Sequence, residues 1–467
     1  MKRKAPRIMS LLMTVSMICS FFGTSLIVPQ HASAEGKAGE ANWPQWRGPD
    51  SNGVSYETNL PATWSNTDNV LWKTAIPGWG HSSPIVWGNR IFLTTAIEGE
   101  VIPGAKAPVH MVEGKPWSHP QAGGADRKHT LKVIAIDRDT GKILWDKTAY
   151  EGTVYDSRHA KASFASPTPV TDGKLVYAYF GTEGMYAYDF NGNLKWKADM
   201  PKIGTVSVGI GTSPVLHGDN VFLLCDNEDG DDSALIALDK KTGKEAWRVS
   251  RKGIEISWAT PIVVRANGRD ELITSGNQFL IAYDPKSGKE LWRSEGLGSN
   301  AIPSSVSGGD MVYIFAGYPK KKVLAVKPGA SGNITGTPNI VWTYDRGVAY
   351  VASPVLYNGF LYLVSDKGII TCLDAKTGEV KYQDGRPPAA ANYMASLVAA
   401  DGRILQFSED GDTFMVKAGP THEITARNTI GEAIYATPAI AGGRIYIRGA
   451  QHLFAIGSAK PAAKAGM

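Results

Sequence analysis

The chain has 467 residues, of which 43% are hydrophobic and 20% charged, and its 51 glycines and 27 prolines indicate a globular, turn-rich protein rather than a disordered chain or a coiled coil. Its formal net charge is +5, but four of its basic residues fall within the first seven positions. The rest of the chain is nearly neutral, so its charge does not indicate nucleic-acid binding.

The N-terminus reads as a secretory signal peptide over residues 1–34. Four early basic residues precede a mainly apolar stretch at 8–28, and Ala32-Ser33-Ala34 offers a cleavage site. We therefore expect export to the periplasm or the medium, and no membrane span once the signal is removed. Two alternatives are a retained membrane anchor and a lipoprotein linked through Cys19, although the residues before Cys19 do not resemble a lipobox. Residues 35–69 would form an N-terminal extension.

A repeated signature, A-x-D-x-x-x-G-K-x-x-W, follows at a spacing of roughly 45 residues, the length of a four-stranded propeller blade. Its first clear copy holds Ala135, Asp137, Gly141, Lys142 and Trp145. The Asp is expected to start a tight turn, the Gly to adopt a left-handed conformation, and the Trp to pack across the seam between blades. The tryptophans assigned this structural role are Trp72, Trp145, Trp196, Trp247, Trp292 and Trp342.

A second pattern marks the start of each inner strand. It is a serine or threonine, followed by proline in most copies, and then a β-rich run. Its eight copies begin at Ser83, Ser166, Ser213, Thr260, Ser304, Ser353, Ser396 and Thr437. These patterns predict an all-β, eight-bladed propeller of four-stranded antiparallel blades over residues 70–457. The last unit supplies three strands, so the outer strand around Trp72 is expected to close the ring. Residues 458–467 would be a disordered tail.

The repeats between Trp72 and Ile456 resemble the PQQ-like, or tryptophan-docking, propeller family. That family includes quinoprotein alcohol dehydrogenases and the outer-membrane assembly lipoprotein BamB. The opening Asn42-Trp43-Pro44-Gln45-Trp46-Arg47-Gly48-Pro49 looks like that of a group of secreted bacterial propellers of unassigned role. The resemblance implies the fold, but one scaffold hosts catalysts, adaptors and sensors, so it does not fix the reaction.

Candidate ligand-binding residues lie in loops that should surround the channel mouth. Aromatic and polar side chains there suit a flat or sugar-like ligand, although they would equally plug the channel as ordinary packing. These candidates are Trp79, His81, His159, Asp226, Trp258, Asn277, Tyr350, Tyr393 and Tyr435. The first unit also carries a long insertion at 96–130, which we interpret either as a functional loop or as a solvated flap.

An acidic loop between the second and third strands of the third unit is the one candidate metal site. It contains Asp226, Asp229, Asp231 and Asp232, and clustered carboxylates are what calcium requires. The alternative is a solvated acidic turn, because the spacing does not match an EF-hand. Cys225 and Cys372 are expected to be buried, unpaired thiols about three blades apart.

Two functions remain open at this stage. The first is an exported, non-catalytic, monomeric binding or scaffold module for a protein, peptide or glycan of the cell envelope, with no cofactor. The second, implied by the family resemblance, is a PQQ- and calcium-dependent oxidoreductase of alcohols or sugars. The chain has no adjacent cysteine pair and no C-x-x-C-H haem motif. The family's catalytic and calcium-ligand motifs do not carry over, so no catalytic residue is assigned.

Overall fold

The computed structural model describes residues 42–112 and 114–458, all within one compact unit. The expected signal peptide, Cys19 and residues 459–467 of the expected tail lie outside the described residues. Within the described part of the chain, no helix is long and apolar enough to cross a membrane.

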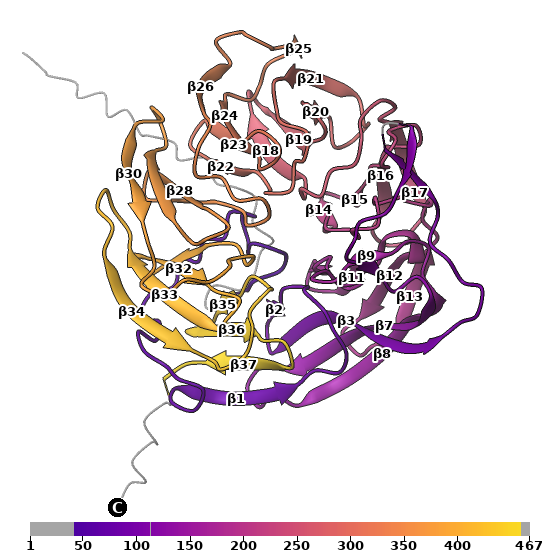
Figure 1. The fold of residues 1–467 in the computed structure, drawn as a ribbon, viewed down its shortest axis with the longest axis horizontal. Helices are drawn as coiled ribbons and strands as arrows, with labels where there is room; N and C mark the ends of the chain where they lie inside the picture. Colours follow the sequence, from indigo (N-terminus) through magenta and orange to yellow (C-terminus); the bar gives the residue numbers. More distant parts are fainter. Residues whose placement is uncertain (1–41, 113, 459–467) are drawn as a thin grey trace, which may run out of the picture. The chain divides into compact units, whose positions relative to one another are not determined.

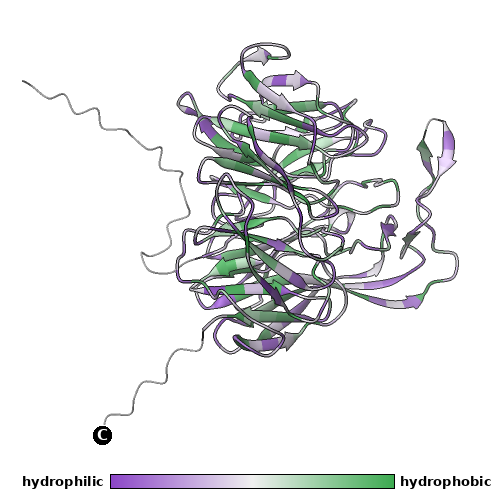
Figure 2. Cartoon of the chain, turned by 60° about the vertical axis from the view of Figure 1, so that its left-hand side comes forward, coloured by the Kyte–Doolittle hydropathy of each residue, from purple (hydrophilic) through white to green (hydrophobic). Residues whose placement is uncertain are grey.

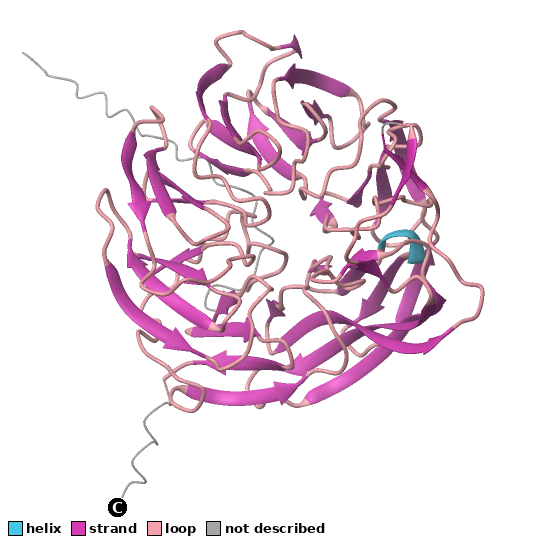
Figure 3. Cartoon of the chain, viewed as in Figure 1, coloured by secondary structure: helices cyan, strands magenta, loops and turns pink. Residues whose placement is uncertain are grey.

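Eight antiparallel β-sheets surround a central axis as the blades of a propeller (Figure 1). The one helical element among the described residues is the short 3-10 turn η1 (Gly181–Glu183), drawn in cyan in Figure 3. The predicted all-β, eight-bladed fold is confirmed. Hydrophobic stretches are concentrated in the strands and hydrophilic ones in the connecting loops (Figure 2), as expected for blades that bury their faces against each other.

Each blade runs outward from a short inner strand near the axis. In blades 1 to 4 the strands are β2 (Ile85–Trp87), β3 (Arg90–Val101), β7 (Arg127–Asp137) and β8 (Ile143–Thr153); β10 (Val170–Thr171), β11 (Leu175–Tyr179), β12 (Met185–Asp189) and β13 (Leu194–Ala198); β14 (Val215–His217), β15 (Asn220–Cys225), β16 (Ala234–Asp239) and β17 (Glu245–Ser250); and β18 (Ile262–Ala266), β19 (Arg269–Ser275), β20 (Phe279–Tyr283) and β21 (Glu290–Glu295).

In blades 5 to 8 they are β22 (Val306–Gly308), β23 (Met311–Ala316), β24 (Lys322–Val326) and β26 (Ile340–Tyr344); β27 (Val355–Tyr357), β28 (Phe360–Val364), β29 (Ile370–Asp374) and β30 (Val380–Gly385); β31 (Val398–Ala400), β32 (Arg403–Phe407), β33 (Asp412–Lys417) and β34 (Ile424–Thr429); and β35 (Ala439–Ala441), β36 (Arg444–Arg448), β37 (His452–Ile456) and β1 (Val70–Ala75). In the last sheet β1 pairs antiparallel with β37, and Trp72 lies opposite Ala455.

Most blade seams share one contact. The indole of Trp247, for example, donates a hydrogen bond to the carbonyl of Pro285 in the next blade, at 3.3 Å. The indole ring also covers Gly288, which has a φ of 72° and leaves no room for a Cβ atom. The same contact recurs at Trp72, Trp145, Trp196 and Trp342. The signature therefore joins a tryptophan of one blade to the Asp-to-Gly turn of the next.

The seam after blade 4 departs from this pattern. Trp292 is fully buried, and its indole donates to the carboxylate of Glu271 in its own blade, at 2.7 Å. The short strand β25 (Gly332–Asn333) lies parallel to β21 beside it, so this sheet has five strands rather than the expected four. The fifth unit lacks the Asp-to-Gly turn, and its longer excursion covers the tryptophan instead.

One inner strand begins later than predicted. The amide of Ser83 donates to the hydroxyl of Thr168, not to that of Ser166, and β10 starts directly after Thr168-Pro169. The expected start at Ser166 is therefore wrong by two residues. Two serine- or threonine-proline pairs occur in succession there, and only contact with the neighbouring blade selects between them.

The insertion of the first unit is more ordered than a bare loop. Strands β3 and β7 continue into it, and it contains the hairpin of β4 (His110–Val112) and β5 (Lys115–Trp117). Farther on, β6 (Ala122–Gly123) pairs with β9 (Arg158–His159), which leads into the second unit. This pairing fixes the end of the insertion beside the axis.

Candidate functional site

A cavity of about 410 Å³ lies among the loops that lead into the inner strands. All eight units contribute to its wall, and the volume falls within the roughly 300–1,000 Å³ typical of small-molecule sites. Five of the predicted residues line it: His81, His159, Trp258, Tyr350 and Tyr435. The structure therefore brings together side chains that are separated by up to 354 positions in the sequence, from 81 to 435.

A ring of hydroxyl groups forms part of the wall. Seven of the eight inner-strand starts donate their backbone N–H to the side-chain oxygen of the equivalent residue in the next unit. Seven such bonds, of 2.8 to 3.1 Å, link Ser83, Thr168, Ser213, Thr260, Ser304, Ser353, Ser396 and Thr437 in that order. The hydroxyl of Ser83 ends the series, is buried, and has no hydrogen-bond partner among the described residues.

The N-terminal extension crosses the channel. Trp43 pairs with Val86 of blade 1, and Asn52 exchanges hydrogen bonds of 2.8 and 2.9 Å with Ser307 of blade 5. Between them, Trp46 lines the cavity. Arg47 is buried and donates to the carbonyls of Asn52 and Pro354. Burial lowers the pKa of Arg47 to about 9. The N-terminal motif that begins at Asn42 therefore has a structural role, because it links blades on opposite sides of the ring.

An aromatic cluster forms one side of the cavity. The His81 ring stacks on Tyr435 with centroids 5.0 Å apart, and Trp79 meets both rings edge-on at 5.1 and 5.5 Å. Burial, with the positive charges of Arg448 and Arg158, lowers the pKa of His81 to about 3. The ring is therefore neutral at physiological pH. Trp79 supports the wall from behind, donating its indole N–H to the Ala162 carbonyl at 3.3 Å.

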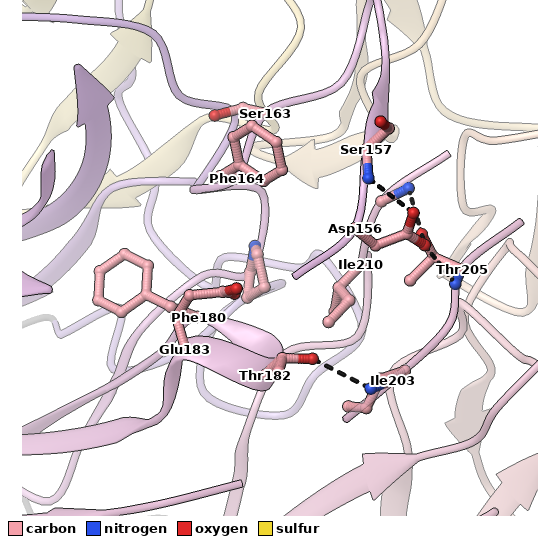
Figure 4. A pocket seen from close by; sticks show the side chains of 12 residues that line it. Asp156, Ser157, Ser163, Phe164, Phe180, Thr182, Glu183, Ile203, Thr205 and Ile210 are labelled. Carbon is pink, nitrogen blue, oxygen red and sulfur yellow. Dashed lines mark hydrogen bonds between the residues drawn. The ribbon is translucent and has the colours of Figure 1, made fainter. Parts of the chain in front are cut away.

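A second wall is held in a strained conformation. Val206 and Ser207 have φ values of 53° and 60°, which are unfavourable for residues other than glycine and most of all for a β-branched one. Asp156 accepts hydrogen bonds from the amide and hydroxyl of Thr205, both at 2.7 Å (Figure 4). Glu228 accepts the Val206 amide at 2.9 Å. Residues 208–211, which follow directly, line the cavity.

His110 from the insertion joins these two carboxylates. Its Nε2 lies 2.9 Å from Asp156, and its Nδ1 contacts Glu228. Burial disfavours the charged ring, but the contacts with Glu228 and Asp156 outweigh it and raise the pKa of His110. The three residues are the group of described side chains that could hold a metal ion. However, both carboxylates already accept backbone donors and the imidazole lies between them, so the arrangement clamps the strained loop.

Glu183 lines a small pocket behind this loop, which Asp156 also lines (Figure 4). Its Oε1 accepts the amide of Tyr155 at 2.8 Å. Burial raises the pKa of Glu183 to about 7, and nearby Asp156 acts in the same direction. The group is therefore partly protonated at neutral pH.

Four predicted ligand residues do not line the cavity: Trp79, which supports the wall from behind, and three that lie elsewhere. Asp226 is fully buried in a two-point ion pair with Arg251, with contacts of 2.7 and 3.0 Å. Asn277 donates to Glu255 outside the cavity. Tyr393 is buried against Gly368. Sequence position placed all three near the mouth, but their side chains turn towards the blade interior or the loop surface.

The structure does not bring the four residues of the predicted calcium site together. Asp226 is engaged by Arg251, while Asp229, Asp231 and Asp232 are exposed and point to solvent. A calcium ion needs several convergent oxygen ligands. One carboxylate of the predicted set, that of Asp226, is already paired with Arg251. The acidic loop is therefore a solvent-exposed turn that begins at a buried residue.

The cavity also does not fit a calcium-bound PQQ. Trp258 is present as a flat platform, with its indole donating to the Gly209 carbonyl at 2.8 Å. Yet no aspartate or glutamate is among the cavity-lining residues in the described chain. A calcium ion over a quinone would need carboxylate ligands there, so no catalytic step is derived through either group.

Several site residues had no clear sequence signal. Trp46 stands in a conspicuous motif, but nothing in the motif places it at the far side of the channel. His119 and Lys161 also line the cavity, and His119 sits in the insertion whose path the sequence does not fix. The residues of the hydroxyl ring could be predicted from the sequence as a repeat, but the hydrogen bonds that link them could not. Cys225 and Cys372 are buried and free, as expected.

Comparison with known proteins gives consistent results. A family model described as outer membrane protein assembly factor BamB matches residues 129–384 and 276–463. BamB from Moraxella catarrhalis has a TM-score of 0.50 at 12% identity, covering 78% of this chain and 99% of that one. A quinohemoprotein alcohol dehydrogenase from Comamonas testosteroni gives 0.58 at 12% identity, covering 91% and 82%. A europium-containing methanol dehydrogenase gives 0.59 at 12%, covering 88% and 90%. No curated protein sequence matches significantly.

Proposed function

We propose that this chain, which belongs to the PQQ-like propeller family described as outer membrane protein assembly factor BamB, is an exported, non-catalytic binding module. Its partner would be a protein, peptide or glycan of the cell envelope, part of which enters the central cavity. The basic and apolar N-terminal sequence supports export. The observation that carries the proposal is the cavity to which all eight units contribute side chains.

Three features of the cavity support binding rather than redox chemistry. Trp258, Tyr350 and Tyr435 offer aromatic faces, and the hydroxyl ring offers polar partners. The strained loop after Val206 is held by Asp156 and Glu228, as a preformed wall would be. The alternative oxidoreductase is less well supported, because the described lining residues include no carboxylate for calcium.

The test is a binding screen with the full secreted chain. Thermal melting would be recorded with envelope glycans, with peptides, and with PQQ plus calcium. We expect a saturable rise in melting temperature with a glycan or peptide. That rise should disappear in Trp258→Ala and persist in Tyr56→Ala, which removes an exposed aromatic outside the cavity.

Two outcomes would overturn the proposal. Saturable binding of PQQ with calcium, accompanied by oxidation of an alcohol, would establish the oxidoreductase instead. Binding of glycans or peptides that is unaffected by Trp258→Ala would place the binding surface away from the cavity.

A further inference from the structure

Two histidines stand side by side in the cavity wall, and they reach it from different parts of the chain. His119 follows β5 in the insertion, and His159 belongs to β9. Their rings meet edge-on with centroids 4.7 Å apart. The pairing of Ala122 with His159 brings the two segments together. The pair is thus a product of the insertion, not of the repeated blade.

Backbone contacts fix the hydrogen positions on both rings. The amide of Gln121 donates to Nδ1 of His119 at 3.1 Å, and the amide of Lys161 donates to Nδ1 of His159 at 3.0 Å. A nitrogen that accepts a hydrogen bond carries no hydrogen, so in the neutral ring the hydrogen is on Nε2. Both rings therefore present an Nε2–H donor. A metal ion would need a free lone pair at Nε2, which this tautomer does not provide.

The two Nε2–H donors lie beside the cationic side chain of Lys161, which also lines the cavity. Burial lowers the pKa of His159, and the neighbouring His119, Lys161 and Arg158 act in the same direction. This histidine is therefore neutral near pH 7. The described lining residues include no carboxylate, and the nearby Glu409 is already paired with Lys161 at 2.8 Å.

The rest of the wall suits a ring that carries hydroxyl groups. Ser83, Thr168, Ser213, Ser396 and Thr437 all line the cavity. The buried Ser83 hydroxyl has no partner among the described residues, and such a group is costly unless a ligand or water bonds to it. Aromatic faces beside hydroxyl donors are suited to sugar rings, which have one apolar face and a polar edge.

We infer that the ligand of this cavity is an acidic saccharide, whose carboxylate accepts hydrogen bonds from Nε2 of His119 and His159. The inference rests on the proposed binding function and specifies its ligand class. A hydroxyl of the sugar bonds to Ser83, and its apolar face lies against Trp258 or Tyr435. An acidic peptide would satisfy the histidines but not the ring of hydroxyls.

Calorimetric titration of the full secreted chain tests the inference with four probes. These are a short galacturonic acid oligomer, the galactose oligomer of equal length, a glutamate-rich peptide of equal charge, and sodium acetate. We expect saturable binding of the acidic oligomer, with the neutral oligomer weaker by about tenfold or more, because charge-assisted hydrogen bonds are lost. The peptide and acetate should show no saturable binding.

Variants then locate the binding site. His119→Phe and His159→Phe keep an aromatic ring but remove the Nε2–H donor, and each should weaken binding of the acidic oligomer by about tenfold without affecting the neutral one. His217→Phe is the matched control, since His217 pairs with Asp270 away from the cavity. Melting temperatures of all variants show whether each is folded.

Each other outcome overturns the inference. Two results would show that the histidine pair has no role, without contradicting the binding function. One is equal binding of the two oligomers, and the other is an unchanged affinity in folded His119→Phe and His159→Phe. Tighter binding of the peptide would replace the ligand class. Absence of binding by any probe, together with failure of the wider screen, would remove the binding function itself.

Discussion

The outer rim and the channel mouth of the same ring are built in opposite ways. At the rim, five tryptophans make the same contact with the next blade, from Trp72 to Trp342. At the mouth, each unit contributes a different side chain, such as His81 from the first and Trp258 from the fourth. Repetition stabilises the scaffold and supplies the hydroxyl groups of the cavity wall, whereas the aromatic and imidazole side chains of the binding surface come from positions at which the units differ.

The largest expected effect lies at the exceptional seam of the rim. Trp292→Ala should lower the free energy of unfolding by about 4–5 kcal/mol, because it empties a fully buried site and removes a donor from buried Glu271. Trp247→Ala, at a regular and half-buried seam, should cost about 2–3 kcal/mol. Denaturant unfolding measures both. Equal losses would show that the two seams are energetically alike.

A glycine pair separates tryptophan docking from backbone strain. Gly243 and Gly253 have φ values of 71° and 84°, but only at Gly243 would a Cβ atom meet a side chain, Trp196, at 2.5 Å. Gly253→Ala should cost about 1 kcal/mol for the left-handed conformation. Gly243→Ala should cost about 3 kcal/mol, because the tryptophan must also move. If chemical unfolding gave the same loss for both, the glycines of the signature would serve the turn alone.

Behind the mouth, Glu183 gives the protein a pH-dependent stability. Its folded pKa of about 7 exceeds the ordinary value of 4.5, so the folded state binds the proton more tightly. Its contribution is greatest below the ordinary value and is lost as the pH rises towards 7. We expect Glu183→Gln to remove this decline, which amounts to about 3 kcal/mol because each pKa unit corresponds to about 1.4 kcal/mol.

The measurement is the unfolding free energy of both proteins from pH 4.5 to pH 8. Glu379→Gln, at an exposed residue, is the matched control. Parallel curves for the wild type and Glu183→Gln would contradict the raised pKa.

The smallest effect on stability is expected at the mouth itself. Tyr350 is 40% exposed and lines the cavity. Tyr350→Ala should change the unfolding free energy by no more than about 1 kcal/mol while weakening binding of the cavity ligand. Calorimetry of both properties tests this. A large loss of stability would mean that the mouth also holds the ring together.

The scaffold could be predicted because its determinants are local and repeated. The Asp137-to-Gly141 turn and the following Trp145 lie within nine residues, so one blade shows the pattern and the others repeat it. The error at Ser166 arose where two similar local signals were adjacent. The departure at Trp292 could not be foreseen, since its partner Glu271 lies in an earlier strand of the same blade.

The site was predicted only in part, for a physical reason. Residues before each inner strand face the axis by their place in the blade, which selected His81, His159, Trp258, Tyr350 and Tyr435. The direction of a side chain in a longer loop depends instead on contacts with distant residues. Asp226 therefore turned to Arg251 and away from the cavity.

The sequence by itself determined the number of units, the strand pattern and the turn chemistry, because hydrophobic periodicity and turn residues act over a few positions. Tertiary structure alone decided that Trp46 reaches the cavity across the channel, that His110 clamps the strained loop, and that His119 stands beside His159. His119 lies 40 positions from His159 and His110 lies 46 positions from Asp156, while Trp46 shares the cavity wall with residues as distant as Thr437. No local pattern encodes these arrangements.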